Sequence, residues 1–259
     1  MSDPGYDSVF FEGHADKARS SAEAIVPLVM ELVAPASVVD LGCGLGTWLA
    51  TFGRHGVHDY LGVDGEWVER GILEIAEDRF RAARLDRPFR LDRRFDLAVS
   101  LEVAEHIPEH AARGFVDTLV RLAPCVLFSA AIPHQGGLQH VNEQWPEYWA
   151  ALFATHGYAV VDAVRPRVWT TARVDFWYKQ NTFIYAREEI LVARPALAIE
   201  RERTVESMLS LVHPRLLTHM AADATKHVRR PTPREYSLRE LVDAFPHVAA
   251  RSLRWRLRR

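Results

Sequence analysis

The most constraining feature of this sequence is a glycine-rich turn near its beginning. Residues 38–40, a β-branched pair and an acid, lead into glycine at every second position, at Gly42, Gly44 and Gly46. Residues 47–52 then suit the start of a helix. A strand, a tight turn and a helix N-terminus present backbone N–H groups to a bound ligand, and glycine allows the positive φ angles and close approach that such a turn needs. The segment therefore predicts a nucleotide-type binding site.

Two common nucleotide-binding motifs fit this turn poorly. A dinucleotide fold requires Gly-x-Gly-x-x-Gly, whereas here the third glycine, Gly46, comes one residue early and Thr47 takes its place. A phosphate-binding loop requires Gly-Lys-Ser/Thr, and no lysine follows these glycines. The spacing therefore argues against both motifs.

A third motif matches. Residues 40–46, Asp-Leu-Gly-Cys-Gly-Leu-Gly, resemble the first motif of class I S-adenosylmethionine-dependent methyltransferases, in which the turn packs against the methionine and ribose part of the cofactor. The resemblance makes Asp64, which ends the next expected strand, the acid that accepts from both ribose hydroxyls, as an ionised carboxylate can. Residues 85–86 resemble the third motif, whose acid meets the adenine amino group. Residues 95–102 resemble the fourth strand and the segment that lines the methionine end.

The resemblance covers roughly residues 38–186, and residues 105–108, Glu-His-Ile-Pro, complete a pattern common in the small-molecule branch of the family. It implies S-adenosylmethionine as the cofactor and S-adenosylhomocysteine as its product. The cofactor-binding residues that it implies are Asp40, Gly42, Cys43, Gly44, Trp48, Asp64, Gly65, Leu85, Asp86, Leu101 and Glu102.

Strand and helix patterns alternate along most of the chain. Strands are expected at 37–41, 59–63, 95–100, 125–130, 158–164 and 181–186, with a weaker pattern near 80–83. Helices are expected from a cap at Ser20 or Ser21 to Val33, after the glycine turn, and at 65–74, 109–122 and 145–156. Such alternation predicts an α/β fold with helices on both faces of a parallel sheet. The resemblance implies the Rossmann-like class I methyltransferase form, a mostly parallel seven-stranded sheet with an antiparallel last strand.

Ligands of such folds bind outside the carboxyl ends of the strands, so one crevice should collect Asp40, Asp64 and residues 100–102. We expect a methyltransferase domain at 1–187, including an N-terminal arm, and a C-terminal extension at 188–259 that is helical or partly irregular. The arm contains three aromatic residues, Tyr6, Phe10 and Phe11. They either pack onto the domain or close over the cofactor. The extension ends in a basic tail, 251–259, which is either a solvated end or a contact for an acidic partner.

Composition limits the partners and the location. The chain has 259 residues and a net charge of −2, so a nucleic-acid partner is not expected. Its two cysteines, Cys43 and Cys125, suggest no disulfide framework and favour a reducing compartment. The sequence shows no signal-peptide pattern and no apolar run near the ~20 residues that span a bilayer. We therefore expect a cytoplasmic protein without stable membrane insertion.

The segment expected to carry the chemistry is 131–149, which follows a strand and so emerges at the ligand end of the sheet. We predict His140 as the base that takes the acceptor's proton, because an unperturbed imidazole titrates near ~6.5. Glu143 or Asn142 would orient the imidazole or the substrate, and His106 is a second catalytic candidate. The Gly-Gly-x-x-His-x-Asn-Glu-Gln pattern also resembles bacterial methyltransferases of glycan and natural-product pathways. The alternative is that these side chains satisfy loop backbone groups and that Glu143 caps the next helix.

Two further patterns leave alternatives open. A metal site of His134, His140 and Glu143 matches no standard zinc spacing and offers few oxygen ligands, so no metal is predicted. Residues 165–181, between the last two strands, are rich in aromatic residues and arginine. They either stack on a sugar or aromatic ring and meet a phosphate or carboxylate, or they form a core cluster or a dimer contact.

Together these patterns predict an enzyme that methylates a hydroxyl of a small, sugar-derived or glycosylated acceptor. The same groups could serve an amine, for which a base matters less because nitrogen has its own lone pair. A NAD(P)-binding oxidoreductase and a non-catalytic S-adenosylmethionine-binding protein are the alternatives from other classes. The expected partner is the small-molecule acceptor, and a homodimer is an open alternative to a monomer.

Overall fold

The computed structural model describes residues 8–228, 237–239, 242–243 and 245–246. Contacts divide the chain into two units, Met1–Leu217 and Thr218–Arg259, and the first unit holds the sheet. Tyr6 and the basic tail at 251–259 lie outside the described residues, as do the side chains of Phe10 and Phe11. The predictions about the arm and the tail therefore stay predictions.

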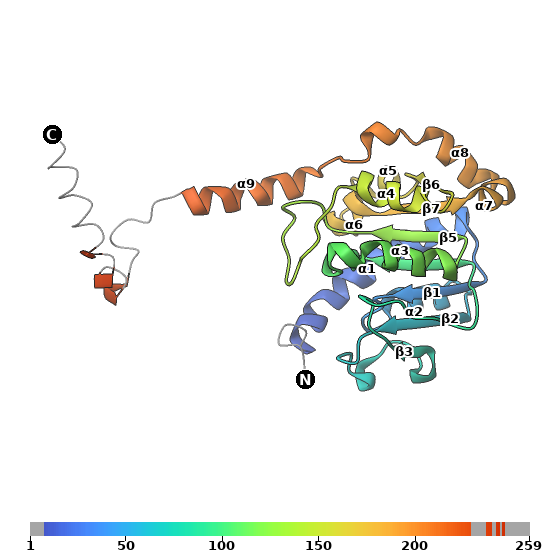
Figure 1. Ribbon diagram of the computed structural model, residues 1–259, viewed down its shortest axis with the longest axis horizontal. Helices are drawn as coiled ribbons and strands as arrows, with labels where there is room; N and C mark the ends of the chain where they lie inside the picture. Colours follow the sequence, from blue (N-terminus) through green and yellow to red (C-terminus); the bar gives the residue numbers. More distant parts are fainter. Residues whose placement is uncertain (1–7, 229–236, 240–241, 244, 247–259) are drawn as a thin grey trace. The chain divides into compact units, whose positions relative to one another are not determined.

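Seven strands form one sheet in the order β3-β2-β1-β4-β5-β7-β6 (Figure 1). They are β1 (Ser37–Leu41), β2 (Asp59–Asp64), β3 (Phe80–Ala82), β4 (Leu97–Leu101), β5 (Cys125–Ser129), β6 (Tyr158–Val161) and β7 (Phe183–Arg187). The first five pair in parallel, and β7 lies antiparallel between β5 and β6. The predicted fold class, with its antiparallel last strand, is confirmed.

Helices cover both faces of the sheet. They are α1 (Ser8–Leu32), α2 (Thr47–Arg54), α3 (Glu109–Leu122), α4 (Pro146–Ala154), α5 (Arg165–Val168), α6 (Phe176–Asn181), α7 (Glu188–Ala193) and α8 (Pro195–Arg203). One core packs α1, α2 and α5 to α8 against one face, and a second core packs α3 and α4 against the other. Short 3-10 turns lie at η1 (Arg70–Ile72), η2 (Glu77–Arg79), η3 (Ala104–His106) and η4 (Glu206–Met208), and α9 (Pro214–Val228) follows. Among the described residues, no helix is both long and apolar enough to cross a membrane.

The start predicted for the first helix is wrong, because α1 begins at Ser8 and runs through Pro27. The two serines expected to cap it make tertiary contacts instead. The Ser20 hydroxyl donates to the carbonyl of Arg173 over 2.8 Å, and the Ser21 hydroxyl accepts from the backbone N–H of Asp175 over 3.1 Å. These serines therefore hold the segment before α6 against α1.

The helix predicted at 65–74 is also wrong, because only the 3-10 turn η1 forms there. Contacts with the glycine turn account for the difference. The backbone N–H of Glu74 donates to the carbonyl of Leu45 over 2.8 Å, and its carboxylate accepts from the Thr47 hydroxyl over 2.7 Å and pairs with Arg19 at 3.0 Å. Glu74 is thereby bonded to the glycine turn and to α1. Its backbone N–H is already used and cannot donate within a continuous helix.

The segment at 165–181 forms α5 and α6. Arg165 is 2% exposed, and its guanidinium donates to the Asp162 carboxylate over 2.9 and 2.6 Å. β6 ends at Val161, before the expected residue 164, and α5 begins at Arg165. Because the buried guanidinium of Arg165 is paired with the Asp162 carboxylate, its contacts match the core-cluster alternative and not an exposed phosphate site.

The chain after β7 continues to pack against the sheet. Leu191 of α7 and Leu197 of α8 are buried in the core that also contains α1 and α2, and the Thr204 hydroxyl accepts from the backbone N–H of Asp162 over 2.9 Å. The boundary predicted after residue 187 concerns the extent of the methyltransferase domain, and it stays a prediction.

Candidate active site

The glycine turn is closely packed between β1 and α2. Its three glycines have positive φ angles of 87°, 52° and 84° at Gly42, Gly44 and Gly46, a region that side chains rarely adopt. A Cβ atom at Gly42 would lie 2.3 Å from the Val103 side chain, and one at Gly46 would lie 2.8 Å from Ile75. Both the backbone angle and the available space therefore require glycine at these positions.

Asp64, at the carboxyl end of β2, joins the turn to the next loop. Its Oδ2 accepts from the backbone N–H of Gly44 over 2.8 Å, and its Oδ1 accepts from that of Gly65 over 2.6 Å. The side chain is buried, and burial raises its pKa while these two N–H groups lower it. Burial, and next the charge of Asp64, raise the pKa of Asp40 well above its ordinary value. The carboxyl ends of β1 and β2 thus hold two neighbouring buried acids.

This arrangement fits a ligand with a ribose diol. A carboxylate offers about four lone-pair positions, and the two backbone N–H groups use only part of the capacity of Asp64. Cys43 packs beside β2, where a Cβ at Gly62 would lie 2.7 Å from its sulfur. The glycine turn therefore packs closely against β2, on the side where Asp64 lies.

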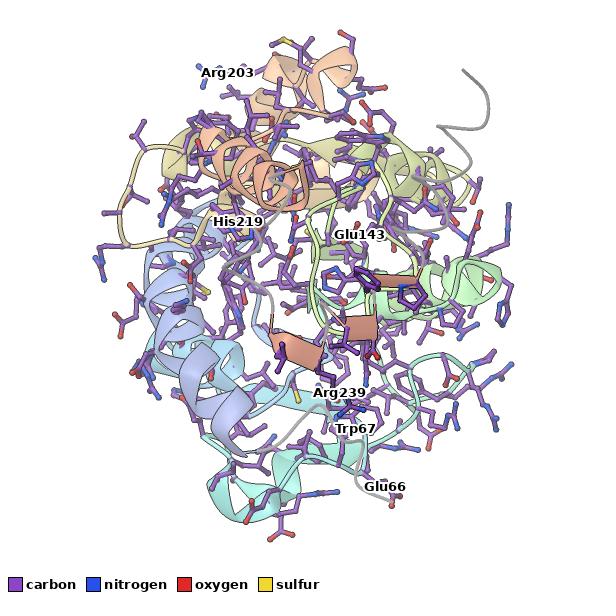
Figure 2. The ribbon with its side chains drawn as sticks, turned by 90° about the vertical axis from the view of Figure 1, so that its left-hand side faces the viewer. Glu66, Trp67, Glu143, Arg203, His219 and Arg239 are labelled. Atoms are coloured by element: carbon purple, nitrogen blue, oxygen red, sulfur yellow. The ribbon has the colours of Figure 1, made fainter. Side chains whose placement is uncertain are left out.

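The other residues of the predicted cofactor set have varied surroundings. Trp48 is buried and meets Tyr178 edge-on, with ring centroids 5.2 Å apart. Asp86 accepts from the guanidinium of Arg84 over 2.9 Å, and this bond lowers the pKa of Asp86. Leu101 ends β4 and is buried. A Cβ at Gly65 would lie 2.2 Å from the ring of Trp67, which is shown in Figure 2.

Glu102 joins three segments at the carboxyl end of β4. Its carboxylate accepts from Gln135 Nε2 over 2.9 Å and from Asn181 Nδ2 over 3.1 Å. Its backbone has a φ of 56°, which is uncommon for a residue with a side chain. Burial raises the pKa of this carboxyl, and its hydrogen bonds oppose the rise. Gln135 and Asn181 were not predicted from the sequence, because nothing in their local context marks them as partners of Glu102.

His140 lies on the loop between β5 and α4 and contacts Glu143; Glu143 is labelled in Figure 2. His140 Nδ1 is 2.8 Å from Glu143 Oε1. The Glu143 carboxylate also accepts from the backbone N–H groups of His134, over 2.7 Å, and Gly136, over 2.8 Å. A Cβ at Gly137 would lie 2.2 Å from His140 Nε2. Any larger residue at position 137 would therefore displace the imidazole ring. Glu143 therefore orients the imidazole and shapes the loop, and it makes no side-chain cap on α4.

Two residues of η3 complete the group around His140. The His106 ring meets the His140 ring edge-on, with centroids 4.9 Å apart, and its Nδ1 lies 3.3 Å from the carbonyl of Gln139. Burial, and next the neighbouring His140, lower the pKa of His106 to about 4. Glu105 is 1% exposed, and its Oε1 lies 4.0 Å from His140 Nε2. Burial, and next Glu102, raise the pKa of Glu105 well above its ordinary value.

Asn142 is buried but serves the loop. Its Oδ1 accepts from Gln144 Nε2 over 3.0 Å, and its backbone N–H donates to the carbonyl of Glu105 over 3.0 Å. Of the two residues expected to orient His140, Glu143 is the one bonded to the ring. Glu105 was not predicted as a candidate, although it immediately precedes His106 in the Glu-His-Ile-Pro pattern.

Comparison with known proteins identifies the class. Residues 14–165, more than half of the chain, match the family model described as a methyltransferase domain. The chain therefore belongs to this methyltransferase family, and its cofactor is S-adenosylmethionine. This result excludes the oxidoreductase alternative. A comparison with curated proteins gave no match.

Solved structures show the same fold at low sequence identity. The sugar N-methyltransferase KedS8 from Streptoalloteichus is 17% identical, with a TM-score of 0.54 over 72% of this chain and 96% of that one. DesVI from Streptomyces venezuelae is 16% identical, with a TM-score of 0.53 over 69% and 95%. An O-methyltransferase family protein from Burkholderia thailandensis is 15% identical, with a TM-score of 0.52 over 69% of this chain and 58% of that one. At these identities the likeness concerns the fold alone.

Proposed function

We propose that this methyltransferase transfers a methyl group to a hydroxyl of a small, sugar-derived or glycosylated acceptor. The observation that carries the proposal is the 2.8 Å contact between His140 Nδ1 and Glu143. A neutral imidazole that donates its Nδ1 proton to a carboxylate has its lone pair on Nε2. Such a ring can take a proton from a hydroxyl, a task that an enzyme needs for oxygen acceptors.

In this proposal the cofactor lies across the carboxyl ends of β1, β2 and β4. Asp64 would accept from the ribose hydroxyls, Asp86 would meet the adenine, and the glycine turn with Leu101 and Glu102 would line the methionine part. S-Adenosylmethionine supplies an activated methyl group. The task of the chain's own residues is to hold the acceptor oxygen in line with that group, and placement alone can lower a barrier by ~7–11 kcal/mol.

His140 is the proposed general base, because its Nε2 lies 4.0 Å from Glu105 of η3, and the acceptor oxygen would lie beside this group. Proton removal by a positioned base contributes about 10²–10⁴ in rate. Glu143 is a positioning residue, since it fixes the tautomer and direction of the ring. His106 packs edge-on against the same ring, so it limits the ring's rotation and is the second residue that an acceptor would meet.

An amine acceptor is the second candidate. The carboxyl groups of Glu102 and Glu105 lie near the loop that carries His140, and their oxygens would accept hydrogen bonds from a neutral amine, which is the form that takes a methyl group. KedS8, which shares this fold, is a sugar N-methyltransferase. For such an acceptor the base matters less, so loss of His140 would lower the rate only slightly.

The experiment is a methyl-transfer screen with radiolabelled S-adenosylmethionine across sugars, nucleotide sugars, phenols and amino sugars, with His140→Gln in parallel. Transfer to hydroxyl acceptors that falls at least about 100-fold in the variant supports the proposal. Transfer to amines alone, unaffected by the variant, would overturn the hydroxyl assignment and leave the methyl donor unchanged. A homodimer, the absence of a nucleic-acid partner and a cytoplasmic location stay predictions of the sequence.

A further inference from the structure

Three side chains with metal-binding atoms converge beside the proposed acceptor position. Glu105, His106 and His140 each offer one such atom, and these atoms all lie within 4.8 Å of one another. We propose that they bind one divalent transition-metal cation. No metal was predicted from the sequence, and the set of candidate ligands considered there shares only His140 with this one.

The distances suit a site that closes around an ion. Glu105 Oε1 and His140 Nε2 are 4.0 Å apart, and the two imidazole rings stand at 85° to each other. A cation about 2.0–2.2 Å from each donor atom brings its ligands to roughly 3.0–3.5 Å from one another. Because the three donor atoms lie up to 4.8 Å apart, binding requires them to approach by up to roughly 1–2 Å.

A second observation points to a missing partner. Glu105 is 1% exposed, and its Oε2 has no hydrogen-bond partner among the described residues. A buried carboxylate oxygen without a hydrogen-bond partner is costly because it has lost its hydration, and backbone hydrogen bonds to this carboxyl oppose the effect of burial only in part. A cation between this carboxylate and the two imidazoles would satisfy it.

Both rings are held in the form that a metal needs. His140 Nδ1 faces the Glu143 carboxylate at 2.8 Å, and His106 Nδ1 faces the Gln139 carbonyl at 3.3 Å. An acceptor oxygen fixes the proton on Nδ1, so Nε2 carries the lone pair in both rings. Metal-binding histidines usually donate their other N–H to a carboxylate or a backbone carbonyl, and here one of each is present.

The donor set selects the kind of ion. Two imidazoles and one carboxylate with open positions suit Fe²⁺, Co²⁺, Mn²⁺ or Zn²⁺, whereas Mg²⁺ and Ca²⁺ prefer oxygen ligands. Glu102 is not a member of the set, because its carboxylate is already bonded to Gln135 and Asn181.

The role of the ion rests on the proposed hydroxyl acceptor. An open position on the cation would bind the acceptor oxygen and lower its pKa. The O–H bond then breaks with release of the proton to water, and that oxygen forms the new C–O bond as the methyl–sulfur bond breaks. With the cation bound, His140 Nε2 would be a ligand and the ion would lower the pKa of the acceptor oxygen; the general-base role proposed above for His140 applies to the enzyme without the ion.

The test uses the full chain without a histidine tag, stripped with EDTA and titrated with Co²⁺ while its visible absorption and the heat of binding are recorded. The expected result is one equivalent of Co²⁺ per chain, bound at least tenfold more weakly by Glu105→Gln and His106→Gln. The matched control is His156→Gln, which removes another histidine beside a carboxylate, 2.8 Å from Asp117, and should bind as the wild type does. Circular dichroism checks that each variant is folded.

Absence of stoichiometric Co²⁺ binding by the wild type, or equal binding by Glu105→Gln, would overturn the site. Methyl transfer to hydroxyls by the EDTA-stripped enzyme would then leave the proposed function standing. Conversely, stoichiometric binding by an enzyme that methylates only amines would support the site and overturn the hydroxyl assignment.

Discussion

The Nδ1 atom of His140 lies 2.8 Å from Oε1 of Glu143. The same carboxylate accepts from two backbone N–H groups of the loop, those of His134 and Gly136. One acid therefore fixes both the direction of the imidazole and the path of the chain that carries it. Because of this coupling, the pair should be sensitive to small changes in the acid.

Replacing Glu143 with glutamine should lower kcat for hydroxyl acceptors about 10–100-fold. The amide loses the charge that fixes the Nδ1 proton and accepts at one atom instead of two. Steady-state kinetics with labelled methyl donor measures the effect. Glu147→Gln is the control, because Glu147 is exposed on α4 and accepts from the Ser210 hydroxyl, away from the His140 ring. Equal rates for wild type and Glu143→Gln would contradict the orienting role.

Gly42→Ala should destabilise the fold by about 1–3 kcal/mol or more and abolish cofactor binding. The new Cβ would need to move the Val103 side chain, 2.3 Å away, while the backbone stays at a φ of 87°. Urea unfolding and calorimetric titration with S-adenosylmethionine measure the two effects. Gly71→Ala meets nothing within 4 Å and should change stability by less than about 0.5 kcal/mol. Similar behaviour of the two variants would argue against a steric need for glycine in the turn.

Asp64→Asn should weaken S-adenosylmethionine binding at least about tenfold, because the amide replaces an acceptor-only carboxylate at the proposed ribose site. Titration calorimetry gives the change in Kd directly. Asp59→Asn, at the opposite end of β2, removes a carboxylate bonded to Arg93 over 3.0 Å and should leave Kd unchanged. Unchanged affinity of Asp64→Asn would place the ribose elsewhere.

The pKa of His106, lowered to about 4, predicts a pH-dependent share of stability. Between about pH 4 and the unfolded value near ~6.5, the unfolded chain holds more protons on this side chain than the folded chain does. The contribution of His106 to the free energy of unfolding is therefore full at pH 7. As the pH falls toward 4, the free energy of unfolding decreases by up to about 3 kcal/mol.

The measurement is the difference in unfolding free energy between wild type and His106→Asn, in EDTA, from pH 7 to pH 4.5. Taking the difference removes the buried acids Asp40 and Glu105, whose raised pKa values act in the opposite direction in both proteins. A difference that stays constant over this range would show that His106 is not held neutral by burial.

Local sequence patterns were sufficient to place most strands, and the family resemblance supplied the antiparallel last strand. Apolar β-branched runs mark the strands, and an acid directly after a strand lies at its carboxyl end whatever the rest of the chain does. Asp40 and Asp64 could thus be placed near the same edge of the sheet, and the structure has them on neighbouring strands and close enough to interact.

The remainder depends on contacts between distant residues. Glu74 leaves its expected helix because it bonds to Thr47, 27 positions away. Asn181 reaches Glu102 across 79 positions, and Glu105 approaches His140 only because a loop after β5 folds back over η3. Neither periodicity nor spacing in the sequence indicates contacts between such distant residues. The surroundings of the proposed acceptor position could therefore be described only from the structure.

Methyl transfer to oxygen, with His140 as the base, is tested most directly by the position of the transferred group. An amino sugar that carries both a free hydroxyl and a free amine is incubated with the enzyme and S-[methyl-¹³C]adenosylmethionine, and the product is analysed by NMR. We expect the label on oxygen, with His140→Gln losing that product. A label found only on nitrogen, formed equally well by His140→Gln, would contradict the proposed function.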